Sequence, residues 1–374
     1  MIFGTRPEAI KMCNLFDELK KEESFNIKLC VSGQHRSMLD QVLSAFNMKP
    51  DIDLNIMKPD QDLFDVTSNS LLAIRDVIKK ENPNLILVHG DTSTALSAAI
   101  AGFYSNIDIG HVEAGLRTYN MKRPFPEEFN RQTIAKISSL NFAPTQSSKA
   151  NLQNDNVNEE SIHVTGNTVI DALFYMLDHI QNSKNELNEV QNILNSKLDF
   201  DWTDNKFILI TGHRRENFGK GFIEICEAIK YLAEANKDIN FVYPVHLNPN
   251  VKEPVLKLLS DMDNISLIEP LDYKPFIFLL KHCFIVLTDS GGIQEEAPSL
   301  GKPVLVMRDE TERPEAVDAG TVKLVGASKE NIISAVTHLL TNSSAYNKMS
   351  NSINPYGDGN ASLRIVKIIR EYLS

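Results

Sequence analysis

Short apolar runs alternate with longer amphipathic stretches along the first half of the chain. Strands are predicted at residues 27–31, 85–88 and 109–112. Helices are predicted between them, at residues 8–20, 36–46, 63–80 and 92–104. The run at 85–88 is apolar on both faces, as expected for a strand that helices cover on each side. The alternation is typical of α/β proteins with parallel sheets.

The second half repeats this pattern. Strands are predicted at residues 207–210, 241–243, 265–268, 284–287, 304–306 and 322–325, and helices at 222–235 and 329–340. The polar stretch 181–204 between the halves is either a linker or, from the spacing of Leu187, Val190 and Leu194, a surface helix. A last amphipathic helix at 361–372 fits either half. We therefore predict an α/β fold with two doubly wound parallel-sheet domains and a cleft between them.

Composition fits a soluble globular protein of two or three domains. The chain has 374 residues, of which 42% are hydrophobic and 23% charged. These values exclude a disordered chain, a collagen-like repeat and a small disulfide scaffold. No apolar stretch approaches the length of a membrane span, and the first residues do not resemble a signal peptide. We expect a cytoplasmic protein without a membrane partner.

The net charge and the cysteine positions limit the classes of ligand and metal site that the chain can have. With 38 basic and 49 acidic residues, the net charge of −11 argues against nucleic-acid binding. An anionic small ligand remains compatible, because local arginines and helix N-termini bind phosphate. The cysteines are far apart in the sequence, at positions 13, 30, 226 and 283, which argues against a structural zinc site. No metal site is predicted.

The loops after the predicted strands carry the candidate chemistry, because ligands of α/β sheets bind beyond the carboxyl ends of strands. Gly4 and Arg6 precede a predicted helix, with Lys11 one turn further on. They form either a phosphate-facing turn or a helix cap with a solvated arginine. Neither the dinucleotide fingerprint Gly-x-Gly-x-x-Gly nor a Walker A loop is present. The sequence therefore predicts no nicotinamide cofactor.

Carboxylates follow three neighbouring elements of the first half. Asp91 is either a helix N-cap or a functional acid, and Glu113 ends a buried strand. Glu127 and Glu128 are either first-turn helix acids or functional groups. A carboxylate at a buried strand end is unfavourable unless it is paired or functional. Together these positions favour acid/base chemistry.

Two loops of the second half favour an anionic ligand. His213 follows an apolar strand and precedes two arginines. The loop 290–292, Ser-Gly-Gly, offers backbone N–H groups and a helix N-terminus to a diphosphate. Glu296, one turn into that helix, is placed to reach a ribose diol attached to the diphosphate. A simple helix cap is the alternative for this loop.

Eight strings of residues carry a family resemblance that spans the chain in order. They are FGTRPEAIKM at 3–12, HGDT at 89–92, HVEAGLR at 111–117, GNT at 166–168, TGHRRE at 211–216, TDSGGIQEE at 288–296, RPE at 313–315 and NPYGDG at 354–359. In these strings the chain resembles the non-hydrolysing UDP-N-acetylglucosamine 2-epimerases.

The resemblance implies a GT-B-like fold, with one domain at 1–166 plus a returning helix at 360–374 and a second, UDP-binding domain at 167–359. It implies interconversion of UDP-GlcNAc and UDP-ManNAc without a cofactor, in a homodimer that supplies ManNAc for cell-surface polysaccharide. Members of the family usually have several more residues before the first string, so the resemblance implies a short first strand here.

The resemblance also assigns site residues by motif match. Catalytic residues are Asp91, Glu113, Glu127 and His213. Substrate-binding residues are Arg6, Lys11, Phe276, Ser290, Gly291, Gly292, Glu296 and Arg313. Bacterial relatives bind a second UDP-GlcNAc as activator, and the matching positions are Gln34, His35, Ser37 and His246. Relatives commonly have an arginine where this chain has Asn69, which predicts weaker activation.

The C2 hydrogen of an N-acetylated sugar is not adjacent to a ring carbonyl, so either oxidation nearby or departure of the C1 group must assist its removal. Without a nicotinamide site, elimination of UDP is favoured. Which carboxylate serves which face of C2 stays open. Three alternatives remain: a GT-B glycosyltransferase, a hydrolysing epimerase that releases ManNAc, and a catalytically silent nucleotide-sugar sensor.

Overall fold

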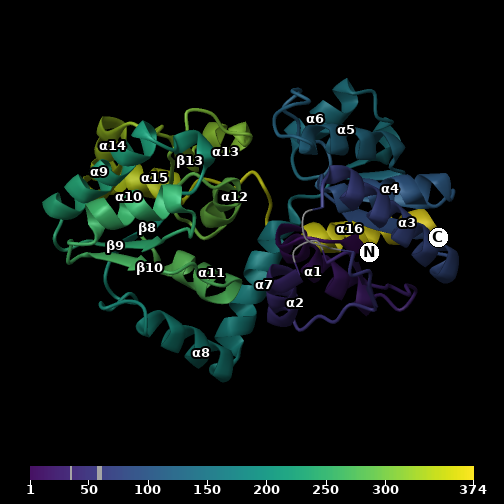
Figure 1. Ribbon diagram of the computed structural model, residues 1–374, viewed down its shortest axis with the longest axis horizontal. Coiled ribbons are helices and arrows are strands. Elements are labelled where there is room, and N and C mark those ends of the chain that lie inside the picture. Colours follow the sequence, from purple (N-terminus) through teal and green to yellow (C-terminus); the bar gives the residue numbers. More distant parts are fainter. Residues whose placement is uncertain (34–35, 57–60) are drawn as a thin grey trace. The chain divides into compact units, whose positions relative to one another are not determined.

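The computed structural model describes residues 1–33, 36–56 and 61–374 (Figure 1). They form two compact units, one of Met1–Tyr175 with Tyr356–Ser374 and one of Met176–Pro355. All strand pairs in both units are parallel, which confirms the predicted α/β class. None of the described helices is both long enough and apolar enough to cross a membrane.

The first unit contains two adjoining sheets. Their strands are β1 (Ile2–Phe3), β2 (Cys30–Val31), β3 (Ile52–Asp53), β4 (Leu85–His89), β5 (Asp108–Val112), β6 (Leu140–Ala143) and β7 (Ile162–Val164). The hydrogen-bonded orders are β1-β2-β3 and β4-β5-β6-β7, and β1 lies beside β4. The combined order 3-2-1-4-5-6-7 is doubly wound, and winding reverses between β1 and β4.

Helices connect these strands. They are α1 (Arg6–Lys21), α2 (Arg36–Ala45), α3 (Leu63–Glu81), α4 (Ser93–Tyr104), α5 (Glu127–Ile137), α6 (Gln146–Asn154) and α7 (Thr168–Asn182), whose last turns belong to the second unit. The final helix, α16 (Ala361–Leu373), packs on α1, and the backbone N–H of Ser362 donates to Asp171 at 2.7 Å. The last helix, which by its apolar pattern alone fits either half, thus belongs to the first unit.

The predicted strand at 27–31 is shorter than expected. Only Cys30 and Val31 pair, with Ile2 and Phe3 of β1 on one side and with β3 on the other. Because both neighbours supply only two paired residues, the ladder cannot extend towards residue 27.

A cavity of about 640 Å³ lies near the beginning of β4, lined by residues 24–27, 81–85 and the end of α16 among others.

The second unit contains one sheet. Its strands are β8 (Phe207–Thr211), β9 (Asn240–Pro244), β10 (Ile265–Ile268), β11 (Ile285–Thr288), β12 (Val304–Val306) and β13 (Val322–Leu324), in the order β10-β9-β8-β11-β12-β13. Counted within the unit, this order is 3-2-1-4-5-6, that of a dinucleotide-binding fold. Winding reverses between β8 and β11.

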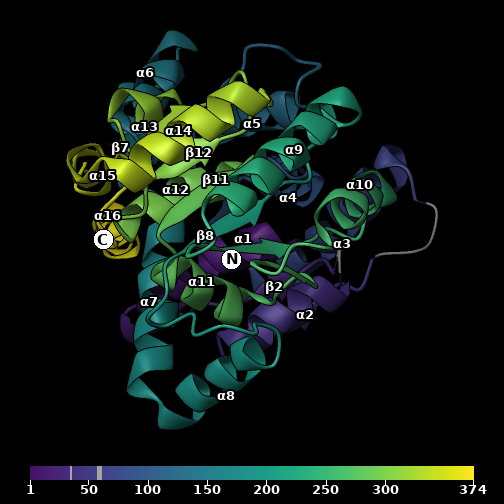
Figure 2. The same cartoon turned by 90° about the vertical axis from the view of Figure 1, so that its left-hand side faces the viewer.

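The core of the second unit lies between this sheet and its helices. The helices are α8 (Lys184–Asn195), α9 (Lys220–Ala235), α10 (Pro249–Leu259), α11 (Tyr273–His282), α12 (Gly291–Ser299), α13 (Pro314–Asp318), α14 (Lys329–Thr341) and α15 (Ser343–Ser350). Ile208 and Ile210 of β8 share one buried cluster with α9, α10 and α14, and α9 packs against both other helices (Figure 2). In the polar stretch, α8 buries Val190 and Leu194, so the helix alternative is correct.

Candidate active site

In the first unit, one buried carboxylate ties together the two loops at the reversal of winding. Glu8 accepts hydrogen bonds from the backbone N–H of Thr5 at 2.8 Å and from the Thr92 hydroxyl at 2.8 Å. The bond from the backbone of Thr5, the N-cap residue, is half of a capping box at the start of α1, and the Thr5 hydroxyl donates to the same carboxylate at 2.8 Å. The loop that carries Arg6 is thereby fixed against the loop that carries Asp91. Neither Thr92 nor Glu8 was assigned a role from the sequence.

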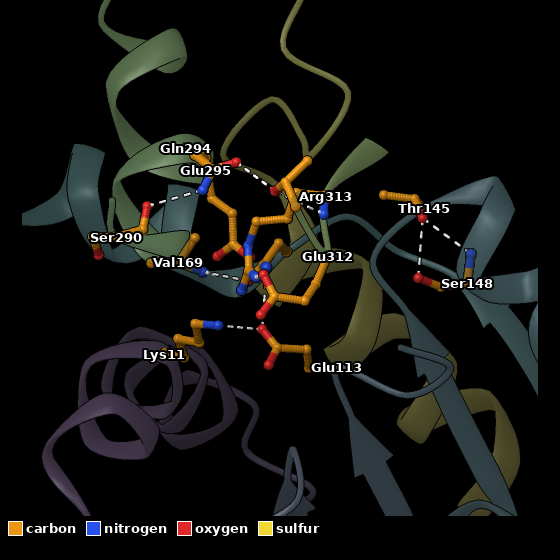
Figure 3. Close-up of polar contacts among 12 residues, drawn as sticks. Lys11, Glu113, Thr145, Ser148, Val169, Ser290, Gln294, Glu295, Glu312 and Arg313 are labelled. Carbon is orange, nitrogen blue, oxygen red and sulfur yellow. Dashed lines mark hydrogen bonds and ion pairs between the residues drawn. The ribbon is translucent and has the colours of Figure 1, made fainter. Parts of the chain in front are cut away.

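Glu113 lies at the end of β5 in an unusual backbone conformation. Its φ of +63° is in the left-handed region, which residues other than glycine rarely adopt. Lys11 forms an ion pair with its carboxylate, as Figure 3 shows, and Asn167 donates to Oε2 at 3.1 Å. His89 Nε2 lies 3.8 Å from the same oxygen. Strained residues with several converging partners are typical of functional sites.

Asp91 follows β4 and pairs with Arg131 of α5, whose Nη2 lies 2.5 Å from Oδ2. Burial raises the pKa of Asp91 above its ordinary value, Arg131 opposes that rise, and the charges of Glu113 and Glu127 add to it. The charges of Glu113 and Glu127 thus both act on Asp91. A buried carboxyl group with a raised pKa beside other carboxylates is a candidate for acid/base chemistry.

The adjacent residues Glu127 and Glu128, which the sequence left undecided, have different environments. Glu128 is fully buried and accepts backbone hydrogen bonds from Thr118 and Tyr119, both at 3.0 Å. Glu127 begins α5, and its buried Oε2 has no hydrogen-bond partner within the described part of the chain. Glu128 therefore anchors the loop before α5, whereas Glu127 offers an unused carboxylate oxygen. The catalytic assignment of Glu127 stays a prediction.

In the second unit, His213 follows β8 and lies beside a buried aspartate. Asp289 follows β11, and its Oδ2 accepts the backbone N–H groups of His213 at 2.9 Å and Arg214 at 2.8 Å. The ring of His213 is partly exposed and stacks on His246, with 5.3 Å between ring centroids. His246, predicted to bind an activator, is therefore a direct neighbour of the predicted catalytic histidine.

The guanidinium of Arg313 lies beside Gly291, at the start of α12. The Arg313 Nε donates to Glu295 at 2.7 Å, and a Cβ added to Gly291 would lie 2.7 Å from Arg313 Nη1. Gln294 donates to the Ser290 carbonyl at 3.2 Å and accepts from the Thr311 hydroxyl at 2.7 Å (Figure 3). Glycine at position 291 thus leaves room for the Arg313 guanidinium next to the N-terminus of α12. The guanidinium and the helix N-terminus both favour the binding of an anion there.

Of the remaining predicted residues, two lie in helices of the second unit, and the others lie wholly or partly outside the described part of the chain. Glu296 is buried in α12 and accepts from the Tyr273 hydroxyl at 3.4 Å, and Phe276 is half-buried in α11. Gln34 and His35 lie outside the described residues. Ser37 is in α2, but its side chain is outside the described part.

Replacing Gly291 with Ala should weaken nucleotide binding without unfolding the protein. The new Cβ would displace the flexible end of the Arg313 side chain and disturb its pair with Glu295. The three atoms nearest to this Cβ all belong to that side chain, and none is a backbone atom. We expect a Kd for UDP about tenfold higher, equal to about 1.4 kcal/mol, and an unchanged thermal midpoint. Titration calorimetry with UDP measures it. Asp318→Asn, which changes an exposed carboxylate of the same unit, is the control and should leave the UDP affinity unchanged. Equal UDP affinity for Gly291→Ala and the native chain would contradict the role of Arg313.

Comparison with known proteins gives matches over the whole chain. A family model described as UDP-N-acetylglucosamine 2-epimerase matches residues 17–370. The UDP-N-acetylglucosamine 2-epimerase of Campylobacter jejuni is 54% identical over 370 residues, which cover 99% of this chain and 96% of the relative. The crystal structure of UDP-GlcNAc 2-epimerase from Neisseria meningitidis bound to UDP-GlcNAc is 50% identical, with a TM-score of 0.90, and covers 99% of this chain and 98% of that chain.

A more distant structure shares only the fold. A glycosyltransferase from Rickettsia africae is 15% identical with a TM-score of 0.61, covering 100% of this chain and 97% of that chain. Together with the Neisseria structure, this match confirms the predicted GT-B-like α/β fold with parallel sheets in two domains.

Proposed function

Because the chain belongs to the UDP-N-acetylglucosamine 2-epimerase family, we propose that it interconverts UDP-GlcNAc and UDP-ManNAc by eliminating UDP and adding it back. The enzyme is an isomerase, a UDP-N-acetylglucosamine 2-epimerase. The observation that carries the proposed mechanism is that Asp91 and Glu113 follow two paired strands, β4 and β5, while Asp91 also pairs with Arg131 of α5, the helix that Glu127 begins. Lys11 and Arg131 lie beside two of these carboxylates.

The proposed reaction has two steps. In the first, a carboxylate removes the C2 proton, the C1–O bond breaks, and its electron pair leaves with UDP, which gives 2-acetamidoglucal. In the second, UDP adds back to C1 while a carboxylic acid protonates C2 from the opposite face. Two faces require at least two proton-transfer groups. In this proposal the carboxylates of Asp91, Glu113 and Glu127 provide them.

The leaving diphosphate needs compensation for its growing charge. In this proposal His213, Arg6, Arg313 and the N–H groups of the loop 290–292 supply it, an effect that is usually the largest in such reactions. Glu296 receives the ribose hydroxyls, and Phe276 contacts the nucleotide.

We extend the proposal to the enzyme's partners. A second UDP-GlcNAc acts as activator through Gln34, His35, Ser37 and His246, more weakly than in relatives that have arginine in place of Asn69. The active form is a homodimer, and the product supplies ManNAc for cell-surface polysaccharide.

Turnover in D2O tests the elimination route. If the abstracted proton exchanges with water, deuterium must appear at C2 of UDP-ManNAc, and the remaining UDP-GlcNAc must acquire it as the reaction runs back. Proton NMR of UDP-GlcNAc incubated with the pure protein follows both signals. Product that retains its original C2 hydrogen would overturn this route in favour of hydride transfer.

The same NMR experiment separates the alternatives. Free ManNAc that accumulates with time would indicate a hydrolysing epimerase. Consumption of UDP-GlcNAc only after addition of an acceptor would indicate a glycosyltransferase, and binding without any exchange at C2 a nucleotide-sugar sensor.

A further inference from the structure

Asp289 is a fully buried carboxylate of which only one oxygen is satisfied. Its Oδ2 accepts the backbone N–H groups of His213 and Arg214, and Asn217 donates to the same atom at 3.4 Å. Its Oδ1 is buried and has no hydrogen-bond partner within the described residues. A buried carboxylate oxygen without a partner is costly, so its retention needs an explanation.

The polar atom that faces this oxygen belongs to the ring of His213. Nδ1 of His213 lies 3.7 Å from Oδ1 of Asp289. A movement of about 0.5 Å would bring the two atoms to hydrogen-bond distance. On its open side the ring stacks on His246, so the imidazole lies between a fixed carboxylate and a second imidazole.

We propose that Asp289 is a positioning residue, which holds His213 with Nδ1–H towards Oδ1 and leaves Nε2 for the departing diphosphate. This inference rests on the proposed role of His213. It assigns to Asp289 the function that a buried aspartate has beside a catalytic histidine, namely to fix the tautomer and to stabilise the imidazolium. The two backbone hydrogen bonds to Oδ2 keep the carboxylate in place while the ring moves.

The charges around the ring support this role. Partial burial lowers the pKa of His213, Asp289 opposes that effect, and His246 and Arg214 lower the pKa further. Asp289 is thus the one group among these neighbours that favours the protonated ring. Protonated His213 is the form that donates to a diphosphate oxygen as the charge on UDP develops.

Asp289→Asn tests the proposal, because an amide oxygen still accepts the backbone N–H groups while the charge is lost. Histidine-labelled full-length protein is titrated by NMR, with His213→Asn to assign the signal. We expect the pKa of His213 to fall by about 1 and kcat to fall about 10²-fold. The KM for UDP-GlcNAc should change much less than kcat. Asp318→Asn, which removes an exposed carboxylate of the same unit, should leave all three quantities unchanged.

A measurement on the native chain covers the case in which Asp289→Asn does not fold. The ¹⁵N shifts of neutral His213 should report a proton on Nδ1. A proton on Nε2 instead, or an unchanged His213 pKa in a folded Asp289→Asn variant, would overturn the inference even if activity were lost. By contrast, full activity of His213→Asn would contradict the proposed function of His213 while leaving the NMR result intact.

Discussion

Glu127→Gln should slow epimerisation by about 10²–10⁴-fold, the usual range for loss of a general acid or base. The substitution removes the charge and the proton affinity of a carboxylate whose Oε2 is buried and has no hydrogen-bond partner in the described structure. No structural hydrogen bond to that oxygen is lost, so the thermal midpoint should hardly change. Steady-state rates in both directions measure the effect.

Glu128→Gln is the matched control, since it makes the same chemical change one residue further along. Here the amide can accept only one of the two backbone hydrogen bonds from Thr118 and Tyr119 that the carboxylate now accepts. We expect a loss of about 1–3 kcal/mol in the free energy of unfolding and a smaller loss of rate than for Glu127→Gln. A Glu127→Gln variant with native rates would remove Glu127 from the mechanism.

Gly115→Ala should destabilise the first unit by at least about 3 kcal/mol. Gly115 follows Glu113 by two residues and has a φ of +95°. An added Cβ would lie 2.3 Å from the carbonyl oxygen of Ser148 and 2.8 Å from its carbonyl carbon, which are backbone atoms of α6 and cannot move aside as a side chain can. Equilibrium unfolding in urea measures the loss.

Gly292→Ala provides the comparison for this stability measurement. Gly292 lies in a helix, and its added Cβ meets no atom within 4 Å. Because alanine is the better helix former, the free energy of unfolding should stay equal or rise by up to about 1 kcal/mol. Equal stability of the Gly115→Ala and Gly292→Ala variants would show that the loop after β5 relaxes around the new methyl group.

The sequence predicts the strands and helices well where apolar patterns are continuous. The predicted strand at 265–268 coincides with β10, because this segment pairs with β9 along its whole length. The prediction at 27–31 is too long, since a strand needs partners and β1 and β3 offer only two residues each. Pairing is a property of neighbours distant in sequence, and apolar periodicity does not report it.

The candidate site follows the same distinction. Residue type and loop position identify Asp91, Glu113, Glu127 and His213 as candidates. Their partners are harder to predict, because Arg131 lies within a helix and Asp289 resembles an ordinary residue before a helix N-cap. The first is found only when α5 is placed against the loop after β4, and the second when β11 is placed beside β8.

The shared carboxylate of Glu8 also constrains how this enzyme can change during evolution. One side chain satisfies donors from Thr5 and Thr92, which are 87 positions apart in the sequence. A substitution of Glu8 leaves the donors of Thr5 and Thr92 unmatched, and a substitution of either threonine removes a donor that the buried carboxylate of Glu8 now accepts. Their effects on fitness should therefore be strongly non-additive, so that drift at one of them is permitted only on a background already altered at another. The loop that carries Arg6 and the loop that carries Asp91 would then be inherited as one module, and an insertion in either loop would be tolerated only away from the residues that contact Glu8.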